Sequence, residues 1–273
     1  MRIFFGILII LCFKEVKAQK IYLLKQWHLP SKVDTTEIEI SKKLAQYANQ
    51  KDLFEKVKVL VEENSVGILL SEGCEKMEID KSFQTKFNGW SYAALEKVRK
   101  ENTYQDILTL LPLKLEVYYL DKIKTLCIDN EELIHKSQIA LSDIRAYVGY
   151  ASRLEEFKQK KDQVSYDRYA KSLLTADQFS KKVDALKVAK EMALKAVDEF
   201  KKVNESREKI IIENIIALKL DPKENMALVI GGVHADELAK SLGRHKWTVE
   251  IYTPKGYVDN DKGLLEEVRR KLQ

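Results

Sequence analysis

The chain of 273 residues has the composition of a folded protein, with 45% hydrophobic and 33% charged residues. These proportions exclude a disordered or fibrous chain, and the length suits one large α/β domain, with or without a sizeable insertion. The formal net charge of +5 is mild, and lysines and glutamates are interspersed along the helical stretches. Because no basic cluster is interleaved with stacking aromatic residues, the sequence argues against a nucleic-acid partner.

The N-terminus has the organisation of a secretory signal peptide. A basic residue precedes an apolar run from Ile3 to Phe13, and the segment ends on the small residue Ala18. The run is too short to span a bilayer, so we expect cleavage after Ala18, export to the periplasm or the cell exterior, and no stable membrane span afterwards. A retained membrane anchor is the alternative. Loss of residues 1–18 lowers the net charge from +5 to +3 and leaves 19–273 as a single α/β domain.

The first strand that the sequence predicts ends close to a histidine. Ile21–Leu24 is a short apolar run, and Pro30 prevents it from continuing as a central strand. His28 therefore follows the carboxyl end of this strand. A helix is predicted next, over residues 35–64, with a break near Asn49.

A second buried strand, Val66–Leu70, is followed by a carboxylate. Glu72 comes just after the apolar run and directly before Gly73, which places it at the same edge of the sheet as His28. A solvated loop glutamate is the alternative interpretation. Polar loops and helix follow, and Leu115–Leu120 is the next predicted strand.

A further strand, Thr125–Ile128, ends at Asp129. This aspartate is a second carboxylate at a strand end, although Asp is also common as the residue that caps a helix N-terminus, and one residue can do both. Cys127 in this strand and Cys74 after the second strand could form a disulfide in an exported protein, but their spacing alone does not decide it.

The sequence from about 131 to 220 predicts a long helical hairpin inserted before the penultimate strand. It has no glycine after Gly149 and no proline, and the polar segment Lys158–Gln163 is the expected turn. The second helix is predicted to run from about Ala176 to Leu220.

A seven-residue repeat in the second helix leads to an arginine. The repeat consists of Phe179, Leu186, Ala193 and Phe200, and its continuation is Arg207. An arginine on an apolar stripe is costly to bury unless an acid or a bound anion pairs with it. The alternative is that the stripe has rotated outward by this point, which would leave Arg207 in solvent.

The penultimate strand, Met226–Ile230, ends at two glycines and a histidine. Gly231 and Gly232 leave room for a group to approach the backbone, and His234 then lies at the carboxyl end of the strand, at the start of an amphipathic helix. A histidine that merely caps this helix is the alternative. The last strand is predicted over Trp247–Tyr252.

Five residues from separate places in the chain thus form one set, namely His28, Glu72, Asp129, Arg207 and His234. Imidazole and carboxylate groups are normal ligands of zinc, manganese and iron. We therefore expect a divalent metal on His28, Glu72 and His234, with Glu72 or Asp129 as general base and Arg207 holding the substrate. Metal-assisted hydrolysis is the reaction class that this set favours.

The same residues resemble a known superfamily, which comprises the TraB/TIKI proteins, the ChaN-type haem-binding lipoproteins and the erythromycin esterases. That group has two GxxH-type motifs, a glutamate that ends the second strand, and an arginine on the helix before the second motif. The late motif is intact as Gly231-Gly232-Val233-His234, and Glu72 and Arg207 match the glutamate and the arginine. The early motif departs, because it reads Lys25-Gln26-Trp27-His28.

The resemblance implies a parallel-rich sheet flanked by helices, with a helical insertion. It also implies an exported metal-dependent hydrolase of peptide or ester bonds, which acts on a peptide or a small ester. The alternative is a haem- or metal-binding protein of the ChaN type without turnover, which the altered early motif favours.

Overall fold

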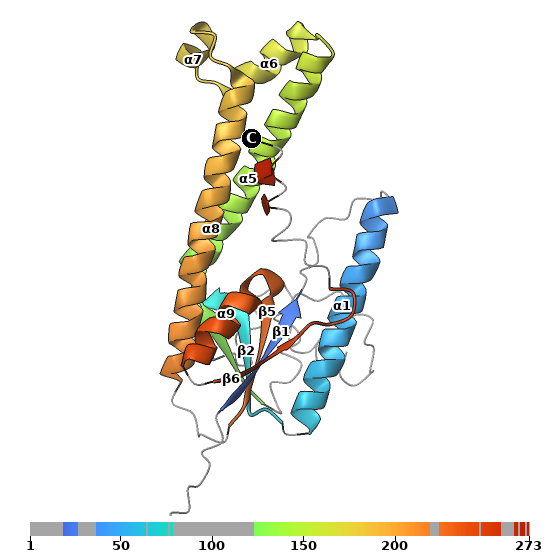
Figure 1. The fold of residues 1–273 in the computed structure, drawn as a ribbon, viewed down its shortest axis with the longest axis vertical. Coiled ribbons are helices and arrows are strands. Elements are labelled where there is room, and N and C mark those ends of the chain that lie inside the picture. Colours follow the sequence, from blue (N-terminus) through green and yellow to red (C-terminus); the bar gives the residue numbers. More distant parts are fainter. Residues whose placement is uncertain are drawn as a thin grey trace, which may run out of the picture.

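A six-stranded sheet lies at the centre of the molecule (Figure 1). The structure is a computed structural model that describes residues 19–26, 37–63, 65–75, 77–78, 123–218, 224–245, 247–257, 265–266, 268–270 and 272. The strand order is β3-β4-β2-β5-β1-β6. The strands are β1 (Lys20–Gln26), β2 (Ile68–Glu75), β3 (Met77–Glu78), β4 (Lys124–Asp129), β5 (Met226–Gly231) and β6 (Thr248–Tyr252).

All the strand pairs except one are parallel. Strand β5 lies between β1 and β2, and among the described strands only the two-residue β3 pairs in the antiparallel direction, with β4. Parallel strands covered by helices are buried on both faces, which explains why β5 is an uninterrupted apolar run that is buried along its whole length. The predicted α/β class with a parallel-rich sheet is confirmed. The predicted strand Leu115–Leu120 lies outside the described residues.

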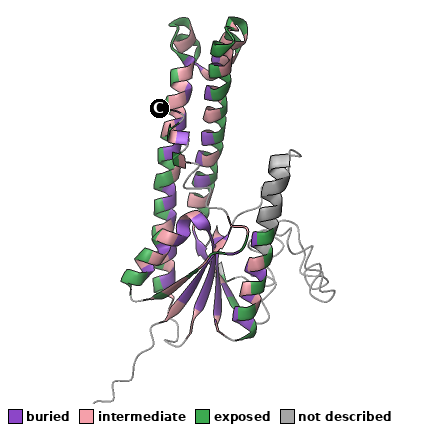
Figure 2. Cartoon of the chain, turned by 45° about the vertical axis from the view of Figure 1, so that its right-hand side comes forward, coloured by how far each residue is buried: buried purple, intermediate pink, exposed green. Residues whose placement is uncertain are grey.

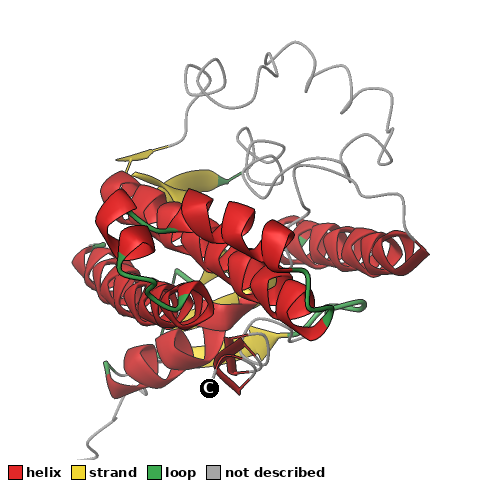
Figure 3. Cartoon of the chain, turned by 90° about the horizontal axis from the view of Figure 1, so that it is seen from above, coloured by secondary structure: helices red, strands yellow, loops and turns green. Residues whose placement is uncertain are grey.

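Helices cover both faces of this sheet. The helices near the sheet are α1 (Glu37–Glu62), α5 (Glu131–Gln159), α8 (Ala185–Ala217) and α9 (Gly232–Arg244). Two further helices, α6 (Gln163–Leu173) and α7 (Ala176–Ser180), lie away from it. In the view from above, α1 lies apart from the paired helices α5 and α8 (Figure 3). The layers therefore follow the usual arrangement of a parallel sheet, whose two apolar faces both need a cover.

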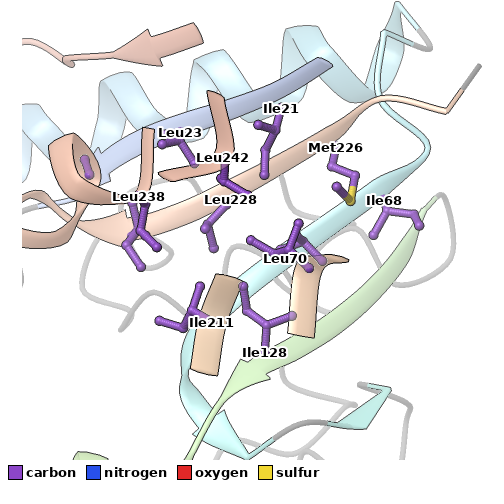
Figure 4. Packing of buried hydrophobic residues seen from close by; sticks show 13 residues of the cluster. Ile21, Leu23, Ile68, Leu70, Ile128, Ile211, Met226, Leu228, Leu238 and Leu242 are labelled. Carbon is purple, nitrogen blue, oxygen red and sulfur yellow. The ribbon is translucent and has the colours of Figure 1, made fainter. Parts of the chain in front are cut away.

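Alternate residues of the strands form the main core. In Figure 4, Ile21, Leu70 and Leu228 point from neighbouring strands toward Ile211 of α8 and Leu238 of α9. All five side chains are essentially inaccessible to solvent. Because side chains alternate across a strand, the intervening residues face the other side of the sheet, where α1 lies.

Helix α1 differs from its prediction in one respect. The predicted break near Asn49 is wrong, because α1 is continuous from Glu37 to Glu62. Asn49 is buried, and its side-chain amide lies 3.5 Å from the carbonyl of Lys25. Asn49 thus faces the end of β1 from within the helix, and it does not interrupt α1.

The long helical hairpin before the penultimate strand is confirmed. Helices α5 and α8 run side by side away from the sheet, with α6 and α7 at the far end (Figure 1). Figure 2 shows buried residues along their facing sides and exposed residues outside. The second helix is shorter than predicted, because Thr175 and Asp184 begin new helices by capping α7 and α8. Phe179 therefore belongs to α7.

Small residues allow α5 and α8 to approach closely. Ala189 and Ala193 of α8 are fully buried against α5, next to Ala151 and Leu154. One polar pair interrupts this apolar interface, since the buried hydroxyl of Ser137 donates to Asn204 Oδ1 at 3.0 Å. The hairpin thus has a core of its own, separate from the core on the sheet.

Candidate functional site

Three of the predicted site residues meet at the carboxyl edge of the sheet. Strand β2 lies between β4 and β5, so Glu72 has Asp129 on one side and Gly231, the last residue of β5, on the other. Arg207 of α8 reaches Asp129 and Glu72, and His234 follows on α9. Glu72, Asp129 and Arg207 thus lie together at this edge, whereas the predicted convergence of His28, Glu72 and His234 on one cleft stays a prediction. His28 lies outside the described residues, so its place in this set stays a prediction.

Asp129 is the anchor of the cluster. Its carboxylate accepts two hydrogen bonds from Arg207, from Nη2 at 2.5 Å and from Nε at 3.3 Å. It also accepts the backbone N–H of Gly73 at 3.0 Å and that of Asn130 at 2.8 Å. Four donors use the lone pairs of both oxygens, so Asp129 is better suited to holding Arg207 than to accepting a proton.

Asn130, and not Asp129, caps the N-terminus of α5. The side chain of Asn130 accepts the backbone N–H of Leu133 at 3.0 Å and caps α5. Because Asn130 satisfies the first turn of the helix, the Asp129 side chain remains directed at Arg207. The interpretation of Asp129 as the cap of this helix is therefore wrong, and its role in a site stays a prediction.

A turn of the backbone at Gly73 brings β2 to Asp129. Gly73 has a φ of 80°, a left-handed conformation in which a side chain would be strained. The register between β2 and β4 shifts at this point, between Ser71 and Glu75. The shift aims the N–H of Gly73 at Asp129, which supplies a physical reason for the glycine that follows Glu72.

Glu72 is held between β5 and Arg207. Its Oε1 accepts the N–H of Gly231 at 2.6 Å, and its Oε2 lies 3.8 Å from Arg207 Nη2. The side chain is 4% exposed. The interpretation of Glu72 as a solvated loop residue is therefore wrong, because it is buried at the sheet edge.

Arg207 is buried as well, and it stays charged. Burial acts to lower its pKa, but the hydrogen bonds to Asp129 and the charge of Glu72 outweigh this effect and raise the pKa above its ordinary value. The prediction that Arg207 points inward toward a carboxylate is confirmed. Its Asp129 contacts make it a fixed counter-ion.

His234 is oriented by Glu208, a residue that the sequence did not predict for the site. His234 Nδ1 lies 2.9 Å from Glu208 Oε1, and the two side chains are 4% and 15% exposed. A carboxylate at Nδ1 favours the tautomer with the proton there, which leaves Nε2 with its lone pair. Glu208 could have been found from its position on α8, since it lies next to Arg207 and one turn before the buried Ile211.

The two glycines before His234, Gly231 and Gly232, make contacts within the protein. A Cβ at Gly232 would lie 1.7 Å from the hydroxyl of Tyr257, so this tyrosine occupies the space that a side chain would need. Gly231 in turn presents its N–H to Glu72. The expected close approach to the backbone is thus made by Tyr257, which no pattern in the sequence singles out.

Lys25, the residue in place of the first glycine of the early motif, also contacts the start of α9. Its side chain is 11% exposed, and Nζ lies 3.1 Å from Asp236 Oδ1 and 5.8 Å from the centre of the Tyr257 ring. An ion pair thus ties the end of β1 to the helix that carries His234.

The described residues contain no group of three or more His, Cys, Asp or Glu side chains arranged to hold a metal ion. Two of the three expected ligands, Glu72 and His234, are described by the structure. The chemistry of their side chains fits such an ion. One supplies a carboxylate, and the other supplies an imidazole whose second nitrogen contacts a carboxylate, as is usual for metal-bound histidines.

The fold and the site define an α/β protein with a buried carboxylate and guanidinium cluster at the carboxyl edge of a parallel-rich sheet. Comparisons with family models, curated proteins and solved structures found no match. Within the described residues, no helix is long and apolar enough to cross a membrane.

Proposed function

We propose that the chain is an exported, metal-dependent hydrolase of peptide or ester bonds, related to the TraB/TIKI, ChaN and erythromycin esterase superfamily. His28, Glu72 and His234 would hold a zinc, manganese or iron ion. When bound, such an ion makes hydroxide available near neutral pH and polarises a carbonyl group.

The observation that carries this proposal is the pair formed by His234 and Glu208. His234 is buried at the start of α9, and its Nδ1 lies 2.9 Å from Glu208 Oε1, which leaves Nε2 as the nitrogen for a ligand. Metal-bound histidines usually have such a carboxylate at the second ring nitrogen. Glu72 is buried at the carboxyl edge of the same sheet and supplies a carboxylate, which is a normal ligand of zinc, manganese and iron.

The residues of the chain have distinct tasks in this proposal. Asp129 fixes Arg207, and Arg207 holds a positive charge 3.8 Å from the carboxylate of Glu72. Glu208 orients the ring of His234 so that Nε2 is the nitrogen available to a ligand. Arg207 is therefore proposed as a positioning residue, which differs from the substrate-binding role expected from the sequence.

Export is supported by two features. The apolar run Ile3–Phe13 before Ala18 has the pattern of a signal peptide. Cys127 takes part in a disulfide, and such bonds persist in oxidising compartments. Mass spectrometry of the exported protein should find Gln19 as the first residue, and retention of Met1 would contradict cleavage.

Metal analysis of the purified protein tests the proposed function. We expect about one divalent ion per chain and its loss in His234→Ala, whereas Glu208→Gln should lower metal affinity by roughly 10- to 100-fold. Glu205→Gln is the matched control, because Glu205 is an exposed glutamate on the same helix. Cleavage of ester or peptide probes should depend on the ion.

Two results would count against a hydrolase. A Soret band that titrates with haem would support the binding protein without turnover. Equal metal content in the wild-type protein and in His234→Ala would show that the ion is bound elsewhere.

A further inference from the structure

The far end of the helical hairpin has an exposed surface that takes no part in the candidate site. We call residues 158–187 the hairpin tip; it contains α6, α7 and the first turn of α8. Figure 1 shows it at the opposite end of the hairpin from the sheet. Helix α8 has 33 residues, which at 1.5 Å per residue makes it roughly 50 Å long. Its C-terminal part packs against the sheet, and we call the part of the hairpin beyond the sheet the arm.

The hairpin tip carries most of the net charge of the chain. Its basic residues are Lys158, Lys160, Lys161, Arg168, Lys171, Lys181, Lys182 and Lys187, and its acidic residues are Asp162, Asp167, Asp177 and Asp184. Eight positive and four negative charges give +4, against +5 for the whole sequence. All eight basic residues are exposed.

The acidic residues of the tip are engaged locally. Asp162 and Asp184 cap α6 and α8, Asp177 pairs with Lys181, and Asp167 accepts a hydrogen bond from Gln163. Within this fully described segment, five basic residues have no ion pair, namely Lys158, Lys161, Arg168, Lys171 and Lys182. The tip therefore presents positive charge outward.

One face of α6 combines this charge with an apolar side chain. Val164, Arg168 and Lys171 follow one another at i, i+4 and i+7, so they share one exposed stripe of the helix. Val164 is 71% exposed, the highest value among the exposed large hydrophobic residues of the described chain.

A second exposed valine lies at the same end of the hairpin. The hydroxyl of Tyr166 contacts Asp184 at 3.3 Å, which joins the start of α6 to the start of α8. Val183, 38% exposed, directly precedes Asp184. Both valines are thus exposed at the end of the hairpin that carries the basic residues.

The aromatic residues near the tip are turned inward. The ring of Tyr169 packs on Tyr150 and Phe157, with ring centres 5.0 and 5.9 Å apart. Single-stranded nucleic acids are typically bound on exposed aromatic faces, on which their bases stack. Aliphatic side chains among lysines instead suit the surface of an anionic bilayer, where the charges meet the headgroups and the apolar groups enter the interface.

We propose that the hairpin tip docks on an anionic lipid surface. Lys161, Arg168, Lys171 and Lys182 contact the headgroups, and Val164 enters the interfacial layer. The arm then holds the sheet and its buried cluster away from the membrane plane. No helix crosses the bilayer in this arrangement.

Vesicle binding tests the charge component. The protein without residues 1–18, as it exists after the expected cleavage, should bind vesicles of equal parts phosphatidylglycerol and phosphatidylcholine but not pure phosphatidylcholine, and salt should weaken the binding. Arg168→Gln/Lys171→Gln should lower the affinity roughly thirtyfold, since each basic residue near an anionic surface contributes about fivefold. The control is Lys195→Gln/Lys202→Gln, which removes two exposed, unpaired lysines from the middle of α8.

Fluorescence tests the apolar component. In Val164→Trp, the added emission should shift to shorter wavelength on phosphatidylglycerol vesicles, whereas Ile139→Trp, at a 48% exposed position nearer the sheet, should not shift. All these positions are exposed, so circular dichroism should remain unchanged. Equal binding by the two double variants, or an unshifted Val164→Trp spectrum, would overturn the proposal.

Discussion

The two halves of α8 bury different kinds of side chain. Near the sheet, α8 buries a charge, because Arg207 lies against two carboxylates. In the arm, the same helix buries alanines, with Ala189 and Ala193 fully inaccessible against α5. A strand edge offers backbone N–H groups that can hold a carboxylate, whereas the side of a helix offers none. The buried charge is thus confined to the part of α8 that faces the sheet edge.

The largest expected effect comes from removing the buried charge. Arg207→Met should lower the free energy of unfolding by about 3–5 kcal/mol, because the carboxylates of Glu72 and Asp129 then lose their counter-ion in a buried site. Urea denaturation measures this loss. Lys195→Met, at an exposed position in the arm, should change stability by less than about 0.5 kcal/mol. Equal losses in both variants would remove the distinction between the two halves.

The contact between Gly232 and Tyr257 gives the next effect. Gly232→Ala should cost about 1–3 kcal/mol, as overpacking does. The helix preference of alanine opposes this loss by at most about 1 kcal/mol, so a net loss shows that the clash dominates. Tyr257→Ala in the same chain should restore part of the stability. A single variant as stable as the wild type would show that Tyr257 can leave this place freely.

The buried polar pair in the arm should have a smaller effect. Ser137→Ala leaves the Asn204 carbonyl without its donor and should cost about 1–2 kcal/mol. Ser137→Ala/Asn204→Leu should recover much of this, because two apolar groups leave no unsatisfied atom. Thermal unfolding of the three proteins makes the comparison. A double variant that is less stable than Ser137→Ala would indicate that the interface depends on the pair itself.

Strand ends and helix periodicity predicted much of the site. Glu72, Asp129 and His234 were found because each follows an apolar run with a clear stop, and Arg207 because it continues an apolar repeat. The chain order also predicted the hairpin, since no glycine or proline interrupts residues 150–220. These patterns are local, so one sequence is enough to reveal them.

Contacts between distant segments could not be predicted in this way. The pairing of Glu208 with His234 and the approach of Tyr257 to Gly232 depend on how α8, α9 and the last segment pack. The division of the second helix was missed because Thr175 and Asp184 act as caps inside a composition that is helical throughout. The side chains of Thr175 and Asp184 accept hydrogen bonds from the first turns of α7 and α8, and the apolar pattern does not reveal such caps.

The smallest effect on stability is expected on the opposite side of the sheet, where a tyrosine of β6 is hydrogen-bonded to α1. Tyr252 donates to Asp52 Oδ2 at 2.6 Å, and the backbone N–H of Lys255 donates to the same oxygen at 2.9 Å. Burial and the carboxylate of Asp52 raise the pKa of Tyr252 to about 12. The protonated phenol is therefore favoured in the folded state.

This pKa sets a pH window for stability. The folded protein holds the Tyr252 proton more tightly than the unfolded chain, whose tyrosines titrate near pH 10. The stabilisation is therefore complete below about pH 10 and is lost as the pH rises from about 10 to 12. Because the phenol is only partly buried, solvent screens the interaction, and we expect a contribution of no more than about 1 kcal/mol. In Tyr252→Phe, urea midpoints should be slightly lower at pH 8 and should decline less steeply between pH 10 and 12. Parallel declines in both proteins would show that Asp52 does not hold this proton.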